Sequence, residues 1–467
     1  FWLKTQALCC VFPRRESSVK MKVVRDSKFR HVFGDPSKQK YEDLRLSSKA
    51  TESTGIRGNS KLFCFPWDSG GGGALAVIPM SRYGRTPRDV PLIIGHSAPI
   101  LDFEFNPFNE NMLVSASEDL TIKAWNVPDE GLKEHLKEPL VTLEGHGKKV
   151  VFCTFNPTAE NIIASASFDL TCKIWNLAEQ DVAYSINLPE QVMCLKWNHN
   201  GSLLAATCKD KKLRIIDPRA KEVVSQCKIH DGAKASKVTW LGDSTKIVTT
   251  GFAQQAERQI AIWDLEKFSN SEDVSVDYLN LLSLDNGTGA LYPFYDESSK
   301  MLYIAGKGDG NVRYFEVTNE DPYLHFISTY SSTVPQKGFD FLPKRCMDTT
   351  KHEIMRGLKL ENSLVQPISF KVPRKSEAFQ EDIYPDAPSM VPSLTADQWV
   401  SGSEARPPIL QSMRPGEAKV EVRKAADTAI VSVKDLKKQL AEAQTRIQSL
   451  EKENELLKQE LAKHTGG

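Results

Sequence analysis

The sequence lacks the features that mark membrane proteins and nucleic-acid-binding proteins. No apolar run approaches the length of about 18 residues that a membrane-spanning helix needs. Its 60 basic and 60 acidic residues leave no net charge, so no global electrostatic field attracts nucleic acid or a membrane surface. Any charge-driven contact must therefore come from a local patch.

The nine cysteines do not form a disulfide or zinc framework. Their number is odd, most stand singly in apolar stretches, and none has CxxC or Cys–His ligand spacing. This pattern indicates a reduced, intracellular protein. The glycine-rich stretches 70–73 and 306–310 do not match GxxxxGK[ST] before a helix, and no carboxylate pair stands out. We therefore expect no cofactor, no metal and no active site.

The chain begins at Phe1, and its first methionine is Met21. In residues 1–20 the apolar part precedes the charges, which is the reverse of the order in a signal peptide. We interpret residues 1–20 as an upstream, non-native segment and expect the native protein to start at Met21. A mitochondrial presequence is the alternative.

What the sequence does contain is an internal repeat of about 40 residues. The segments 95–126 and 145–176 align without a gap and share Gly-His, Phe-Asn-Pro, Ser-Ala-Ser, Asp-Leu-Thr and Trp-Asn. Their short alternating apolar stretches between turn residues predict strands. A Gly-His opening and a Trp-Asn or Trp-Asp ending in units of this length are typical of WD40 blades.

Weaker copies surround the two strong ones. They cover residues 192–217, 237–264 and 290–316, with a strand-like segment at 62–79 and an incomplete last unit at 323–342. One blade cannot bury both of its faces, whereas a closed ring of blades does. The sequence therefore predicts an all-β, seven-bladed propeller over residues 21–345. We expect Ser27–Phe33 to pair with the last blade and close the ring.

A His, a Ser, an Asp and a Trp recur at the same offsets in both strong repeats. They are His96, Ser115 or Ser117, Asp119 and Trp125 in the first copy, and His146, Ser165 or Ser167, Asp169 and Trp175 in the second. A Ser-His-Asp set suggests a protease. Because a catalytic set need occur only once, the duplication favours a structural hydrogen-bond network, and we expect no enzyme.

Several segments resemble the coronin family. VRDSKFRHVFG at 24–34 is similar to its N-terminal signature, and YEDLRLS, GHSAPILDFEFNPFNE, GKGDGNVRYFEV and IYPDAPSMVPSLTADQWVSGSEARPPIL follow in the family's order. The resemblance covers about residues 21–410. It implies filamentous actin as a partner, contacts with the branched-filament nucleating complex and with cofilin, and a place in the cytoplasm at the actin-rich cortex.

Residues 346–410 are rich in proline and polar residues and have little periodicity. The resemblance implies that this C-terminal extension packs along the underside of the propeller, with residues 395–400 as a short helix. The small and charged residues that follow indicate a flexible linker over 411–430.

A heptad repeat predicts a short, parallel α-helical coiled coil over residues 431–463. Complementary charges flank its seam, because Arg446 would face Glu451 of a neighbouring chain. A single amphipathic helix packed on the propeller is the alternative. Asn454 in the seam favours a dimer, whereas RIQSLE at 446–451 resembles a trimer-specifying pattern, and we favour a trimer. The a and d positions are Val433, Leu436, Leu440, Ala443, Ile447, Leu450, Asn454, Leu457 and Leu461.

The resemblance points to exposed basic residues as contacts, because the actin filament surface is acidic. Arg45 falls where the family carries a basic residue associated with filament binding. For each candidate, an ordinary solvated charge is the alternative. The expected function is to organise or remodel cortical actin networks through oligomerised propellers. A general WD-repeat scaffold for membrane or vesicle traffic, without direct filament binding, is the competing hypothesis. The candidates are Arg25, Lys28, Arg30, Arg45, Lys437 and Lys438.

Overall fold

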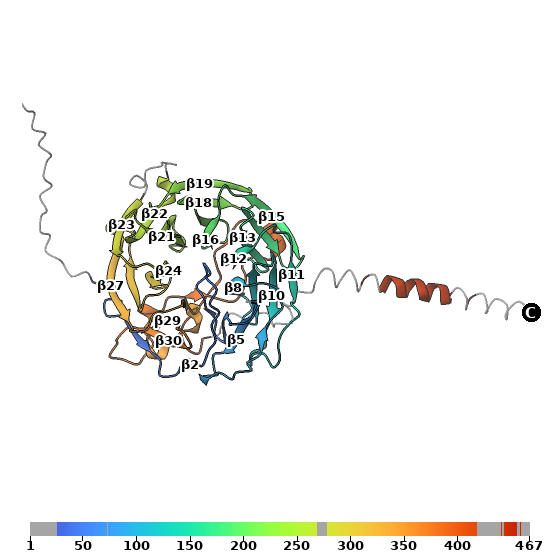
Figure 1. The fold of residues 1–467 in the computed structure, drawn as a ribbon, viewed down its shortest axis with the longest axis horizontal. Coiled ribbons are helices and arrows are strands. Elements are labelled where there is room, and N and C mark those ends of the chain that lie inside the picture. Colours follow the sequence, from blue (N-terminus) through green and yellow to red (C-terminus); the bar gives the residue numbers. More distant parts are fainter. Residues whose placement is uncertain are drawn as a thin grey trace, which may run out of the picture.

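The computed structural model describes residues 26–71, 73–268, 278–417 and 443–454, and the single residues 440 and 458. Seven β-sheets stand around a ring, one blade beside the next (Figure 1). The fold is the all-β, seven-bladed propeller that the repeats predict.

Six blades are four-stranded antiparallel sheets. The first contains β3 (Arg57–Gly58), β4 (Leu62–Pro66), β5 (Leu75–Pro79) and β7 (Leu92–Ile93), and the second β8 (Ile100–Phe105), β9 (Met112–Ser117), β10 (Ile122–Asn126) and β11 (Val141–Leu143). The third contains β12 (Val150–Phe155), β13 (Ile162–Ser167), β14 (Thr171–Asn176) and β15 (Asp181–Asn187), and the fourth β16 (Val192–Trp197), β17 (Leu204–Cys208), β18 (Lys212–Asp217) and β19 (Glu222–Lys228). The fifth contains β20 (Lys237–Trp240), β21 (Lys246–Phe252), β22 (Arg258–Asp264) and β23 (Tyr278–Asp285), and the sixth β24 (Leu291–Asp296), β25 (Met301–Gly306), β26 (Asn311–Val317) and β27 (Leu324–Ser331).

The apolar content of each strand follows its place in the blade. All residues of β12 and β13 are buried, because both faces of an inner strand pack against neighbouring blades. The outer strand β15 is mostly half-buried or exposed. Inner strands can therefore be continuously apolar, whereas outer strands carry polar residues.

The seventh blade joins the two ends of the propeller. β28 (Gly338–Phe341), β29 (Glu353–Leu360) and β30 (Val365–Lys371) are followed in the sheet by β2 (Tyr41–Glu42) and β6 (Gly84–Arg85). β1 (Phe33–Pro36) also pairs antiparallel with β30, with Phe33 opposite Lys371 and Pro36 opposite Ile368. The N-terminal strands thus supply the outer edge of the last blade and close the ring.

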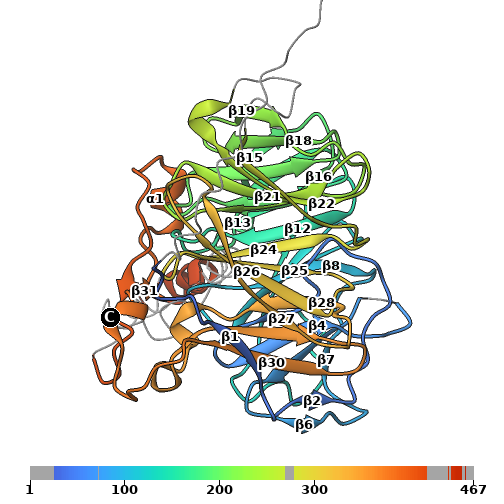
Figure 2. The same ribbon diagram turned by 90° about the vertical axis from the view of Figure 1, so that its left-hand side faces the viewer.

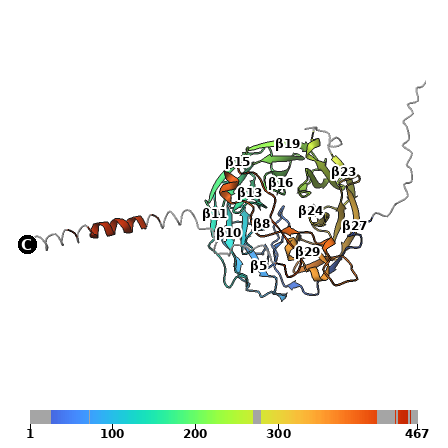
Figure 3. The same cartoon turned by 180° about the vertical axis from the view of Figure 1, so that it is seen from behind.

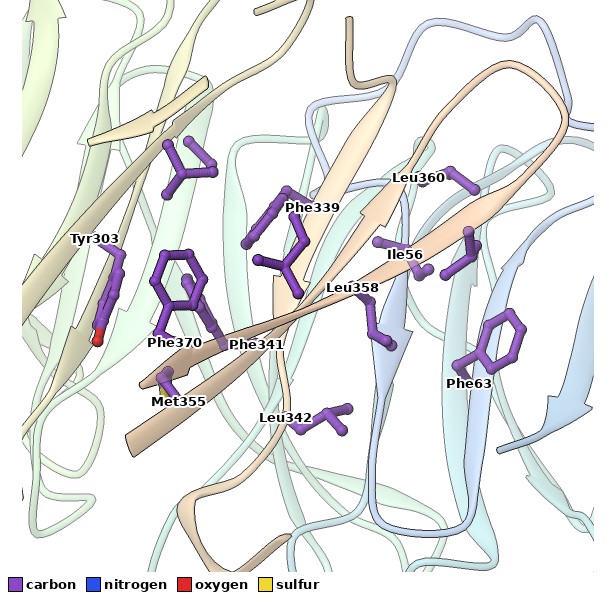
Figure 4. Close-up of a cluster of buried hydrophobic side chains, with 14 of the residues drawn as sticks. Ile56, Phe63, Tyr303, Phe339, Phe341, Leu342, Met355, Leu358, Leu360 and Phe370 are labelled. Atoms are coloured by element: carbon purple, nitrogen blue, oxygen red, sulfur yellow. The ribbon is translucent and has the colours of Figure 1, made fainter. Parts of the chain in front are cut away.

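A large hydrophobic cluster lies beneath this closure. Figure 4 shows Phe339 and Phe341 from β28 beside Met355, Leu358 and Phe370 from the two following strands, with Ile56 and Phe63 from the first blade and Tyr303 from the sixth. Because the cluster joins the first, sixth and seventh blades, the closure is held by packing as well as by strand pairing.

The structure corrects three expectations about this closure. The ring does not end at residue 345, because β29 and β30 complete the seventh blade from residues assigned to the extension. The unit expected at 323–342 is also divided, since β27 belongs to the sixth blade. Moreover, the closing strand is 33–36 rather than 27–33: residues 28–31 form a turn that buries Phe29, while Phe33 is exposed.

After β30 the chain runs over one face of the ring (Figures 2 and 3). It forms the short pair β31 (Ala387–Pro388) and β32 (Leu410–Gln411) and the helix α1 (Ala396–Val400). Thr395 caps α1 through a capping box with Gln398, which explains why a helix starts there. The remaining ordered turns are the 3₁₀ segments η1 (Leu265–Lys267), η2 (Lys344–Cys346), η3 (Thr349–Lys351) and η4 (Glu381–Ile383).

Trp399 fixes the extension to the third and fourth blades. Its side chain is fully buried, its ring meets Trp197 edge-on at 5.8 Å, and its indole N–H donates to the Gly201 carbonyl at 2.9 Å. The guanidinium of Arg219 lies 4.7 Å from the ring centre. Gly201 is in the β16–β17 turn, which joins the first and second strands of the fourth blade. The extension therefore covers the face of the ring on which these first-to-second-strand turns lie.

Candidate functional site

The recurring polar residues of the second blade form one hydrogen-bonded chain. His96 Nδ1 lies 2.8 Å from Asp119 Oδ2, and its Nε2 lies 2.7 Å from Ser115 Oγ. The Trp125 indole N–H donates to the same hydroxyl at 2.8 Å. The loop before β8, the β9–β10 turn and the buried Trp are thereby tied together.

The third blade repeats this chain with nearly the same geometry. The distances are 2.9 Å from His146 to Asp169, 2.7 Å from His146 to Ser165, and 2.7 Å from Trp175 to Ser165. Both serines are fully buried. A substrate cannot reach a buried hydroxyl that already accepts a hydrogen bond from an indole N–H. The arrangement is therefore that of a structural network and not of a protease.

The fifth blade holds a third network, which the sequence interpretation missed. His230 Nε2 lies 2.8 Å from Thr249 Oγ1, and the Trp263 indole donates to that hydroxyl at 2.7 Å. The separation of 19 residues from His to hydroxyl equals that in the other two copies. Gln259 takes the place of the Asp, with its Oε1 3.4 Å from His230 Nδ1. The equal separation was the signal that could have revealed it.

The partners of these histidines set their protonation. Burial lowers the pKa of His146, although the Asp169 carboxylate acts in the opposite direction. His230 faces an uncharged amide instead, and burial lowers its pKa to about 4. Burial would raise the pKa of Asp169, but hydrogen bonds from Thr171, the Gly147 N–H and His146 outweigh it and bring that pKa to about 2. At neutral pH all these groups favour the charge states that the network requires.

Arg45 lies on the face opposite the C-terminal extension. Its carbonyl accepts a hydrogen bond from the Asp68 N–H, and Leu46 forms a bridge with Trp67 in the β4–β5 turn. The β4–β5 turn joins the second and third strands of its blade, whereas the β16–β17 turn joins the first and second. Because successive antiparallel turns alternate between the two faces of the ring, the two turns lie on opposite faces. The Arg45 side chain is exposed, and among the described residues it has no ion-pair partner.

The structure does not bring the basic candidates together. Phe33 pairs with the last residue of β30 and Tyr41 with its first. The chain between Lys28 and Arg45 therefore runs along β30 from one face of the ring to the other. Lys28 Nζ donates to the Asp382 carbonyl of the extension at 3.2 Å. Arg30 is exposed in the same turn. Arg25, Lys437 and Lys438 lie outside the described residues.

The segment that follows Arg45 enters the mouth of the central channel. The buried Lys237 ammonium, on the inner strand β20, lies 2.5 Å from the Glu52 carboxylate and also donates to the Met193 carbonyl at 2.9 Å. The Tyr292 hydroxyl donates to the Glu52 carbonyl at 3.3 Å. Glu52 is thus attached to the inner strands of the fifth and sixth blades.

The GDGN segment, read in the sequence as a family signature, supports an ion network between the fifth and sixth blades. Arg258 contacts both Asp309, at 2.8 Å, and Asp285, at 2.5 Å, and Arg313 also binds Asp285. The Arg258 side chain is 3% exposed. Hydrogen bonding to Arg258 is the main cause that lowers the pKa of Asp285. This signature therefore has a structural role.

Residues 443–454 of the predicted coiled coil are helical. Their seam residues are exposed in the single chain: Ile447 by 55% and Leu450 by 42%, with Leu440 at 59%. Arg446, Glu451 and Asn454 are exposed as well, whereas Leu457 lies outside the described residues.

Within the described ranges, no group of three or more His, Cys, Asp or Glu side chains is placed to hold a metal ion. A search of the same residues for a helix long and apolar enough to cross a bilayer found none.

Comparison with family models extends the repeat assignment. Residues 89–126 match the WD domain, G-beta repeat, residues 153–243 match the anaphase-promoting complex subunit 4 WD40 domain, and residues 365–407 match a type of WD40 repeat. Residues 22–85 match a domain of unknown function, DUF1899. That last match spans the N-terminal segment that closes the ring.

Two proteins resemble this chain over most of its length. Coronin-A of Dictyostelium discoideum is 49% identical over 389 residues, which is 83% of this chain and 85% of the relative. The crystal structure of the WD40 domain from Toxoplasma gondii coronin superposes with a TM-score of 0.78 at 41% identity, covering 83% of this chain and 98% of that one.

Proposed function

Because the chain belongs to the coronin family, we propose that it binds actin filaments and organises cortical actin networks through oligomerised propellers. Its family and its WD-repeat fold are those of a non-enzymatic protein. The observation that carries the proposal is the Arg45 side chain, which stands exposed and without a carboxylate partner among the described residues. A free guanidinium is available to an acidic surface and needs no internal ion pair to be broken.

The second part of the proposal is multivalency. Exposed leucine and isoleucine side chains at the a and d positions form an apolar stripe, which a second helix buries in a coiled coil. We propose a parallel trimer, with a dimer as the alternative. Linking weak sites raises apparent affinity by about 10² to 10⁴-fold without any new contact. The propeller then needs only a weak contact with each filament subunit.

Cosedimentation with filaments tests the contact. We expect Arg45→Asp to lower the bound fraction sharply, because it reverses a charge at the interface. Arg406→Asp is the matched control, since Arg406 is exposed on the extension, on the other face of the ring. Equal pelleting of both variants and the wild type would show that Arg45 makes no contact.

A chain that ends at Arg423 tests multivalency. We expect it to sediment as a single copy and to lose about 10²-fold or more in apparent filament affinity. Leu450→Pro with Leu457→Pro should have the same effect in the full chain, because proline breaks the helix. Mass measurement by analytical ultracentrifugation distinguishes trimer from dimer.

A tail-less chain that pellets as well as the intact one contradicts this part of the proposal. Capture of peptides without filament preference would instead favour the scaffold hypothesis.

A further inference from the structure

A basic cavity opens on the face that carries Arg45. Its volume is about 530 Å³, and it is lined by Lys49, Lys307 and Lys337 together with hydroxyl residues of the segment 47–51. None of the described lining residues is Asp or Glu. Three positive charges without a matching carboxylate make this cavity different from the ion-paired sites elsewhere in the ring.

The three lysines come from separate parts of the fold. Lys49 belongs to the N-terminal segment, Lys307 to the β25–β26 turn, and Lys337 to the chain just before β28. Lys307 is half-buried and donates to the Thr51 carbonyl at 3.0 Å, which uses one of its three donors. Lys49 and Lys337 are exposed, and the structure gives their ammonium groups no partner among the described residues. The fold therefore brings together charges that repel one another.

Proximity of the charges is reflected in the titration of Lys307. Burial lowers its pKa, and the neighbouring Lys237 and Lys337 lower it further, while Glu52 acts in the opposite direction. The Glu52 carboxylate pairs with Lys237, so it offsets only part of the positive charge around Lys307. A bound anion would relieve this repulsion and receive charge-assisted hydrogen bonds from several directions.

We propose that this cavity binds a phosphate group, carried either by a soluble phosphate ester or by a lipid headgroup. A phosphate offers several acceptor oxygens, and the cavity is lined by residues that can donate to them: the three lysines and the hydroxyl residues Ser47, Ser48 and Thr51. The cations that line the cavity are lysines, which bind phosphate as point charges. The inference does not depend on actin binding.

Calorimetric titration of the full chain with inositol 1,4,5-trisphosphate and with inorganic pyrophosphate tests the site. We expect saturable binding that weakens with salt. Lys307→Gln should weaken it at least tenfold, and Lys49→Gln combined with Lys337→Gln should do the same without altering any side-chain bond within the ring. Lys133→Gln is the control, because it removes one exposed lysine outside the cavity. Thermal unfolding of each variant verifies that it is folded.

Flotation with vesicles identifies the source of the phosphate. Phosphatidylcholine vesicles containing phosphatidylinositol bisphosphate are compared with vesicles of equal charge containing phosphatidylserine. Preference for the first, lost in the cavity variants, indicates a lipid headgroup; binding of the soluble probes alone indicates a soluble ester. The proposal is wrong if no probe binds the wild type, or if the cavity variants bind every probe as tightly as Lys133→Gln does.

Discussion

Acidification should destabilise the propeller through His230. This side chain is 2% exposed, and burial lowers its pKa to about 4, whereas in an unfolded chain a histidine titrates near 6.5. Between these two values the unfolded state binds a proton that the folded state excludes. Stability is therefore fully present above about pH 6.5 and is lost as the pH falls toward 4.

The size of this effect follows from the two pKa values. One pK unit corresponds to about 1.4 kcal/mol, so lowering the pKa from 6.5 to about 4 amounts to about 3 kcal/mol between those pH values. That loss is a substantial part of the 5–15 kcal/mol or so that stabilises a typical folded protein. Below about pH 4 His230 is protonated in both states, so it no longer changes the free energy of unfolding as the pH falls.

The different partners of His146 and His230 suggest how to test whether the low pKa of His230 causes the loss of stability. His146 has a carboxylate on its Nδ1 side, whereas His230 has the Gln259 amide at 3.4 Å. Gln259→Glu should supply the missing negative charge, raise the pKa of His230 and shrink the loss of stability. Gln255→Glu adds the same charge at an exposed position of the same hairpin and serves as the control.

The assay is denaturant unfolding between pH 4 and 7, with the histidine titrations followed by NMR. We expect the wild type and Gln255→Glu to lose stability in parallel as the pH falls, and Gln259→Glu to lose less. The reasoning is refuted if the three proteins share one pH profile, or if the His230 resonance titrates near 6.5 in the folded wild type.

Substitutions at Trp399 and Arg258 probe two contacts that hold the fold together. Trp399→Ala should release the extension at a cost of about 3–5 kcal/mol. Trp399→Phe should cost only about 0.5–1.5 kcal/mol, because it removes the indole hydrogen bond while the Gly201 carbonyl still accepts one from Asn156. Hydrogen exchange confined to residues near 394–403 would show local release, and unchanged protection there would contradict it. Arg258→Met should cost about 3–5 kcal/mol, because it removes the buried cation that joins Asp285 to Asp309 and leaves Asp285 with Arg313 alone. Arg374→Met, which breaks a more exposed pair with Asp382, should cost less than about 1 kcal/mol. Equal melting temperatures for the two variants would show that the buried network is not stabilising.

The sequence predicted the ring but not the details of its closure. Repeats with Gly-His and Trp-Asn landmarks define their own strands, and two good copies are enough to place the weaker ones. The last blade has no such landmarks in β29 or β30, so its strands were assigned to the extension. At the N-terminus, Phe29 and Val32 are buried through a turn and not through a strand. An apolar residue shows that a segment packs, but the pairing register decides which residues form the strand.

Among the polar sites too, some could be predicted from the sequence and others could not. The networks of His96 and His146 repeat within the sequence and could be recognised there. The third network escaped because threonine replaces serine and Trp263 lies 14 residues from its hydroxyl partner in place of 10. The basic cavity could not be predicted at all, since Lys49, Lys307 and Lys337 are far apart in the chain and meet only when the seventh blade closes.

One stretch of chain, residues 26–56, both closes the ring and carries the proposed filament contact, so a change there could alter binding by damaging the fold. Arg45 avoids this ambiguity. Its backbone makes the structural contact, a hydrogen bond from the Asp68 N–H to its carbonyl, whereas its side chain is exposed. The neighbouring Leu44 is buried and Glu52 is held by Lys237. Arg45→Asp should therefore keep the unfolding free energy within about 0.5 kcal/mol of the wild type, as surface substitutions usually do. A loss of filament binding without a loss of stability then identifies the side chain itself as the contact.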